Sequence, residues 1–110
     1  MPKQVEYNYI TGQPKDVLPH LKSSVGLYLT FNSEVKVGIT GRDPQDRFNE
    51  HLKFKNWDRM IIKYVTMSER NANCLEDYLI ANYPDLINKW IGTSYLSKDG
   101  YNYLYVLVTK

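Results

Sequence analysis

The sequence has a single cysteine, Cys74, so an internal disulfide is excluded. Two histidines, His20 and His51, accompany it, which leaves no zinc-ligand spacing. No run approaches the roughly 18 apolar residues of a membrane span, and the first residues lack the apolar core of a secretion signal. One cysteine and no membrane segment are typical of a reducing compartment, so we expect a cytoplasmic protein that does not bind membranes.

A strong charge of either sign is also missing. Lys and Arg number 14 and Asp and Glu 12, which gives a net charge of +2. That value does not by itself indicate a nucleic-acid partner. The basic residues are concentrated, however, between Lys36 and Lys63, and a local basic strip can bind phosphates. A solvated surface of mixed charge explains the same composition.

The length of 110 residues predicts a single domain, residues 1–110. We expect its core at about 25–90, with an N-terminal arm at 1–24 and a C-terminal β-hairpin at 94–110. The arm contains three of the chain's five prolines, which favour an irregular conformation. The short alternating stretch near Val5–Ile10 predicts at most a short strand. The predicted fold class is α+β.

The stretch from residue 25 to residue 40 predicts a β-hairpin. Val25–Phe31 and Val35–Thr40 both alternate apolar and polar residues, and the three residues between them suit a tight connection. In this register Tyr28 faces Gly38, where the missing side chain leaves room for the ring. Tyr28 and Lys36 are then expected to lie side by side.

Residues 43–53 predict a capped helix. Asp43 is a favourable N-cap residue, and Pro44 suits the first helical position. The helix is expected to continue to about Lys53. Arg47 and His51 lie four residues apart, so they should stand one above the other on the same stripe.

A third strand is predicted at Arg59–Met67, and Ser68 is expected to cap a second helix that ends before Pro84. Period two places Ile61 and Val65 on one face of the strand. The helical period turns Glu76 toward the body of the protein and Asp77 further out.

The C-terminal residues predict the second hairpin. Ser94–Lys98 and Tyr101–Val108 are joined by Asp99-Gly100, which suits a type I′ turn. Three tyrosines of the last strand share a face and could stack on unpaired bases, although β-propensity explains them as well and is the interpretation we favour. They are Tyr101, Tyr103 and Tyr105.

Several residues in these elements suit phosphodiester hydrolysis, which needs a base for water and cations at the scissile phosphate. Arg47 suits the phosphate, and Glu76 suits a magnesium ion that keeps most of its waters. Tyr28 or Lys36 can activate water if neighbouring cations or burial lower its pKa. The basic strip further supplies nucleic-acid contacts at Arg42, Lys53 and Lys55. Each residue also has an ordinary structural explanation.

The order of these motifs resembles the GIY-YIG nuclease domain. Its two triplets correspond to Gly26-Leu27-Tyr28 and Lys36-Val37-Gly38, with lysine in place of the second triplet's tyrosine. The matching continues over about residues 25–90, through Ile39-Thr40-Gly41-Arg42, Arg47 with His51, Glu76, and Asn88. Lysine occurs in some branches of the family, so this departure need not remove activity.

The resemblance implies a small three-stranded antiparallel sheet flanked by helices, to which the C-terminal hairpin would be added. It implies one Mg²⁺ or Mn²⁺ ion on Glu76, water activation by Tyr28 or its neighbour, and stabilisation of the phosphate by Arg47. His51 joins this catalytic group. Asn88 resembles an asparagine found near such sites, and Gly26 and Gly38 would be structural.

We therefore predict a metal-dependent endonuclease that acts on nucleic acid, with DNA favoured over RNA. The alternative is a non-catalytic nucleic-acid-binding or inhibitory module on the same fold. A third interpretation is a protein-interaction domain that uses the tyrosine-rich hairpin. We expect no separate DNA-reading domain, so specificity would need a homodimer, an accessory protein or recognition of nucleic-acid shape. A phage, mobile-element or repair setting fits these features.

Overall fold

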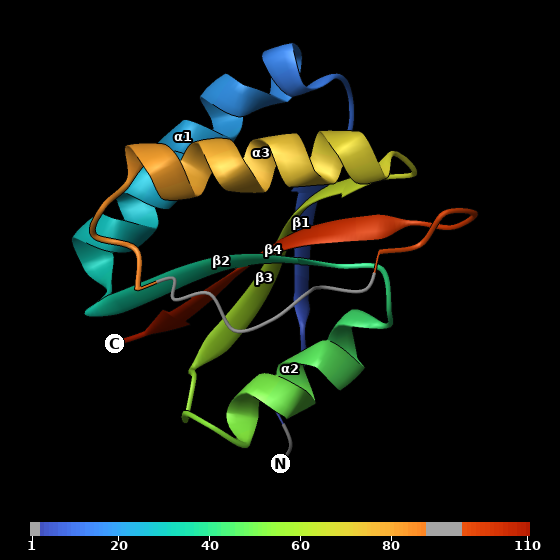
Figure 1. Cartoon of the computed structure of the whole chain (residues 1–110). Helices are drawn as coiled ribbons and strands as arrows, with labels where there is room; N and C mark the ends of the chain where they lie inside the picture. Colours follow the sequence, from blue (N-terminus) through green and yellow to red (C-terminus); the bar gives the residue numbers. More distant parts are fainter. Residues whose placement is uncertain (1–2, 88–95) are drawn as a thin grey trace.

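The structure is a computed structural model that describes residues 3–87 and 96–110. Within those ranges the chain forms one sheet of four strands in the order β1-β3-β4-β2, together with three helices (Figure 1). β1 runs parallel to β3, whereas β4 runs antiparallel to both β3 and β2. The predicted α+β class is confirmed, but the expected three-stranded antiparallel sheet is wrong. In chain order the elements are β1 (Glu6–Ile10), α1 (Pro14–Phe31), β2 (Glu34–Thr40), α2 (Pro44–Leu52), β3 (Arg59–Thr66), α3 (Glu69–Asn82) and β4 (Asn102–Thr109).

The sheet has a helix layer on each side. α1 and α3 lie next to each other over one face, and α2 lies on the other side (Figure 1). We call these the α1/α3 face and the α2 face. The core of the α1/α3 face is the larger, and its strand residues include Val35, Val37, Ile39, Leu104 and Val106. The core of the α2 face consists of Phe48, Trp57, Met60, Ile62, Val65, Tyr105 and Leu107.

Helices α2 and α3 begin where the capping residues predict. The Asp43 side chain accepts a hydrogen bond from the Gln45 amide at 3.3 Å, and Pro44 follows it in the first turn. The Ser68 hydroxyl accepts from the Asn71 amide at 3.1 Å. These side chains satisfy amide groups that have no partner inside the helix, so the chain enters each helix at a fixed residue.

The predicted hairpin at Val25–Phe31 and Val35–Thr40 is wrong, because residues 25–31 belong to helix α1. The buried residues Val17, Leu21 and Val25 recur every four positions, which is a helical spacing that continues into these residues. Leu27, an apolar residue of the predicted strand, is 59% exposed on the helix. The short strand expected near Val5–Ile10 is confirmed as β1, but the rest of the expected N-terminal arm contains most of helix α1.

Strand β2 pairs with β4 instead. In this register Lys36 lies opposite Leu107, Gly38 opposite Tyr105, and Thr40 opposite Tyr103. The alternation within β2 holds, so Lys36 and Gly38 are on the α2 face. The distant strand β4 therefore pairs with β2 in place of the predicted strand at Val25–Phe31. As a result Tyr105, and not Tyr28, lies opposite Gly38.

Strand β3 is confirmed, but its register changes between Ile62 and Tyr64. The extra residue is Lys63, and an extra residue of this kind is a β-bulge. The bulge puts Val65 in the core of the α2 face, while Tyr64 belongs to the α1/α3 core. The predicted sharing of a face by Ile61 and Val65 is therefore wrong.

The C-terminal segment confirms one strand of the predicted hairpin. β4 takes Asn102–Thr109, close to the predicted Tyr101–Val108. Of the other predicted strand, residues 94–95 lie outside the described residues, and Leu96–Lys98 are not in a strand. No helix within residues 3–87 and 96–110 has both the length and the apolar character needed to cross a membrane.

Candidate functional site

Tyr105 is the central side chain of the α2 face. It lies in β4 opposite Gly38 of β2 and is 1% exposed. A Cβ atom added at residue 38 would come within 2.7 Å of the Tyr105 ring carbon Cε1, so the ring occupies the space that the glycine leaves. The sequence predicted a ring over Gly38, but it assigned Tyr28 to that place.

Arg47 and His51 of α2 both reach the Tyr105 hydroxyl. His51 Nε2 lies 2.8 Å from the hydroxyl oxygen, and Arg47 Nε donates to the same oxygen at 3.4 Å. The two residues are one helical turn apart and share a stripe, as their spacing predicted. Arg47 Nη1 also lies 3.8 Å from the Glu50 carboxylate. A single buried hydroxyl thus fixes the position of both side chains.

His51 is neutral in the folded protein at physiological pH. Burial, with further contributions from Arg47 and Lys36, lowers the pKa of its imidazole from 6.5 to about 3. Because the Tyr105 oxygen accepts from Arg47, its own proton can be donated to His51 Nε2 when Nδ1 carries the ring hydrogen. Burial raises the pKa of the Tyr105 hydroxyl, so this proton is retained.

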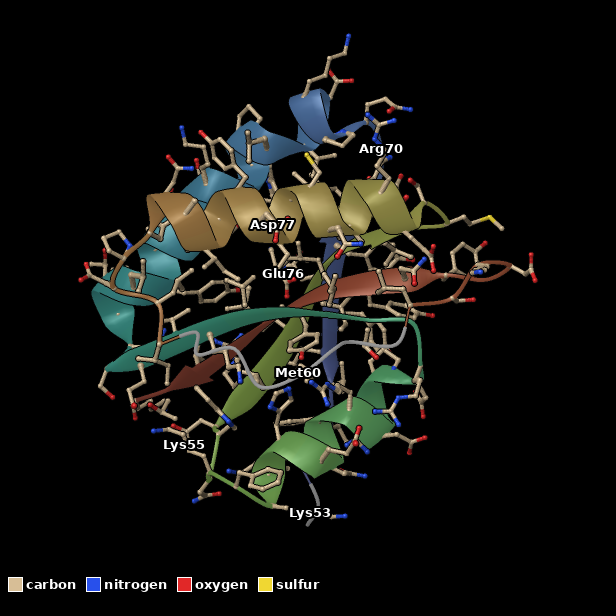
Figure 2. The ribbon with its side chains drawn as sticks, in the orientation of Figure 1. Lys53, Lys55, Met60, Arg70, Glu76 and Asp77 are labelled. Carbon is tan, nitrogen blue, oxygen red and sulfur yellow. The ribbon has the colours of Figure 1, made fainter. Side chains whose placement is uncertain are left out.

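Lys36 and Glu76 complete the group of charged side chains. Burial and the charge of Arg47 lower the pKa of the half-buried Lys36, and Glu76 acts against that shift. Burial, together with Asp77, raises the pKa of Glu76 to about 7, while Lys36 and Arg47 oppose the rise. Glu76 is on the side of α3 that faces the sheet (Figure 2). Each of these charges affects the pKa of another, although Glu76 lies on the α1/α3 side of the sheet and Lys36 and Arg47 lie on the α2 face.

Tyr28 is not part of this group. It lies in helix α1, and the charged side chains that affect its pKa are Arg59 and Glu6, which form an ion pair at 2.7 Å. Burial raises the pKa of the Tyr28 phenol, which is opposite to the lowering by neighbouring cations that a base would need. The expected pairing of Tyr28 with Lys36 is wrong, because helix α1 removes it from the sheet. Gly26 is also in α1, with open space where a Cβ would be.

The other predicted contact residues are spread over the surface around α2. Arg42 forms an ion pair with Glu50 at 2.5 Å. Lys55 pairs with Glu34 and lies over the Trp57 ring, 5.3 Å from its centroid. Lys53 is exposed at the end of α2, and Figure 2 shows it with Lys55 at the edge of the molecule furthest from α3. Asn88 lies outside the described residues.

Sequence reasoning missed Tyr105 as a member of the site. The available signal was Gly38, since a glycine within a strand marks close approach by a neighbouring group. The three tyrosines of the last strand were recognised as sharing a face. What was missing was the pairing of β2 with β4, which selects Tyr105 as the residue opposite the glycine.

Glu76 has the chemistry of a magnesium ligand. Among the described residues no three His, Cys, Asp or Glu side chains form a metal-binding group. Magnesium often takes only one or two carboxylates and keeps its other positions for water and phosphate. The half-buried Glu76 carboxylate fits this one-ligand arrangement, although the ion would compete with a proton because the pKa of Glu76 is about 7.

Comparison of the chain with protein-family models, with curated proteins and with solved structures gives no match.

Proposed function

We propose that this chain is a nuclease of the GIY-YIG type that hydrolyses phosphodiester bonds in nucleic acid, with DNA as the expected substrate. The observation that supports the proposal is the convergence of Arg47, His51 and Tyr105 through one hydroxyl, with Lys36 and Glu76 in electrostatic reach. This group joins a fixed guanidinium, a desolvated amine and a carboxylate, which are the side-chain types that the reaction requires.

Arg47 binds the scissile phosphate in this proposal. Its side chain is 22% exposed, so part of the guanidinium remains accessible to a substrate. Planar guanidinium groups bind phosphate oxygens through two parallel hydrogen bonds. Tyr105 and His51 act as positioning residues, because the buried hydroxyl holds the guanidinium at a defined place before substrate arrives.

Lys36 is the general base that activates water in this proposal. The sequence left this role open between Lys36 and Tyr28. Burial and Arg47 lower the pKa of its amine, which increases the neutral fraction that can accept a proton from water. The water oxygen then attacks phosphorus, and the leaving oxygen takes a proton from solvent. Glu76 would hold a Mg²⁺ or Mn²⁺ ion, which when bound supplies charge stabilisation at the phosphate.

A cleavage assay tests this proposal. The purified chain is incubated with supercoiled plasmid and with labelled single-stranded DNA and RNA, in Mg²⁺, in Mn²⁺ and in EDTA. We expect metal-dependent products from the wild type and a loss of at least about 100-fold for Arg47→Ala and for Glu76→Ala. Arg70→Ala is a matched control, since this residue is exposed on α3 (Figure 2).

Two outcomes would decide against the nuclease. Cleavage at the wild-type rate by purified Arg47→Ala or Glu76→Ala would remove the proposed site. Binding of nucleic acid without product in either metal would favour the second candidate, a non-catalytic binding or inhibitory module. That candidate is supported by Lys36, which stands in the second triplet at the position where the family's pattern has tyrosine.

A further inference from the structure

Helix α2 covers only part of its face of the sheet. Beyond it lie three tyrosines, which we call the tyrosine platform: Tyr7, Tyr9 and Tyr103. Tyr7 is 57% exposed and Tyr9 49% exposed, and Tyr103 packs half-buried against the core of this face. Tyr7 and Tyr103 lie close enough for Tyr103 to affect the pKa of Tyr7.

The strand register places the platform on the same face as the Tyr105 site. Tyr7 pairs with Ile62, and Ile62 pairs in turn with Tyr105 on the next strand. Residues in such a cross-strand row share a face. Val5 packs against the α2 core and Ile10 against the opposite one, so the alternation of β1 puts Tyr9 on the α2 face as well.

The register places Lys63 of β3 next to the cross-strand row that contains Tyr7. Ile61 and Tyr64 belong to the core of the α1/α3 face. The β-bulge puts two residues between them, Ile62 and Lys63, and both therefore lie on the α2 face. Lys63 is 3% exposed, and burial lowers the pKa of its amine. Within residues 3–87 and 96–110 no carboxylate forms an ion pair with it, and Asp43 is the acid that contributes to the raised pKa of Tyr7.

We propose that the tyrosine platform binds an unpaired nucleic-acid strand, with bases stacked on Tyr7 and Tyr9 and the backbone directed toward Lys63 and Arg47. Stacking on exposed rings tolerates any base, because every base has a π-face, and lysines and arginines supply the phosphate contacts. A duplex hides its base faces, so the platform selects single strands, loops and frayed ends. This inference rests on the proposed function for its partner, and it names the substrate class of the same site.

β-propensity alone accounts less well for these residues. It favours tyrosine in strands, but it does not require two tyrosines to remain about half exposed on one face of an edge strand. A protein partner can cover the same rings, but Lys63, which forms no ion pair within residues 3–87 and 96–110, adds a positive charge that favours an anionic occupant. A single strand matches both the rings and the charge.

Binding is measured by fluorescence anisotropy at low salt with labelled oligonucleotides of about 12 nucleotides. The probes are oligo-dT, oligo-U and a duplex DNA of the same length, in EDTA so that cleavage does not interfere. We expect both single strands to bind more tightly than the duplex. Tyr7→Ala with Tyr9→Ala removes two stacking rings and should weaken single-strand binding by at least about 30-fold.

Two further variants separate stacking from general effects. Lys63→Met keeps the aliphatic stem but removes the charge, so it should weaken binding of both single strands and reduce the salt dependence by about one counterion. Phe31→Ala is the matched control, since it truncates a ring that is 76% exposed on α1. It should leave binding unchanged, and circular dichroism with thermal unfolding verifies that every variant is folded.

The proposal is overturned if the tyrosine double variant binds oligo-dT as the wild type does, or if the duplex is preferred. Absence of binding to all three probes also overturns it, and would leave the face to a protein partner or a second copy of the chain. These results are distinct from failure of the nuclease. Cleavage that depends on Arg47 and Glu76 but is unaffected by the tyrosine variants would retain the active site and remove the platform.

Discussion

His51 Nε2 lies 2.8 Å from the Tyr105 hydroxyl oxygen, across 54 positions of sequence. This contact joins α2 to the middle of strand β4, and the rings meet edge to face with centroids 5.6 Å apart. Both side chains are buried, so the pair is shielded from competition with water. The position of Arg47, and with it the proposed phosphate site, depends on this contact.

Two glycine substitutions test the packing of Tyr105 against β2. Gly38→Ala would place a methyl group against the ring, so we expect a decrease in the free energy of unfolding of about 1 to 3 kcal/mol. Gly26→Ala meets open space inside helix α1 and should increase stability by about 0.5 to 1 kcal/mol. Urea denaturation followed by circular dichroism measures both. If residues 25–31 formed a strand opposite Gly38, Gly26→Ala would not stabilise the protein as a helical residue does.

Removal of a single hydroxyl distinguishes the two candidate tyrosines. Tyr105→Phe leaves the buried His51 Nε2 without its partner and releases Arg47, so it should cost about 1 to 3 kcal/mol of stability and lower cleavage by about tenfold. Tyr28→Phe should leave cleavage unchanged, because Tyr28 lies beside Arg59 and Glu6. Initial cleavage rates with plasmid measure the difference. The reverse ranking would restore the site predicted from the sequence.

The raised pKa of Glu76 predicts a pH-dependent cost in stability. The carboxyl titrates near 4.5 in the unfolded chain and near 7 in the fold, so the folded state holds more protons between these values. The free energy of unfolding therefore falls as the pH rises from 4.5 to 7, and it stays lower above that range. Glu76→Gln lacks this cost. Its stability relative to the wild type should increase over the same range by on the order of 1 to 3 kcal/mol.

Urea unfolding of wild type and Glu76→Gln at a series of pH values measures that difference. The free energies of unfolding of the two proteins are subtracted at each pH, because His51 changes the stability of both with pH in the opposite direction. Its pKa falls from 6.5 to about 3 on folding, so its stability contribution is present above pH 6.5 and is lost as the pH falls toward 3. A difference between the two proteins that is constant with pH would contradict the buried environment of Glu76.

The sequence by itself determined the elements with strong local signals. The Asp43 and Ser68 caps set the starts of α2 and α3, since these side chains bind nearby amides whatever the rest of the fold does. Four-residue spacing likewise predicted that Arg47 and His51 would share one stripe. It also indicated a ring over Gly38 and an inward Glu76, because these expectations depend only on residue size and helical period.

Tertiary structure decided which segments pair and therefore which tyrosine joins the site. The alternation at Val25–Phe31 is compatible with a strand, but burial of Val17, Leu21 and Val25 against the sheet stabilises one continuous helix instead. β2 then takes β4 as its partner, across more than 60 residues, and Tyr105 replaces Tyr28. Long-range pairing and the bulge at Lys63 depend on the packing of the whole sheet against two helix layers, and no local pattern specifies that packing.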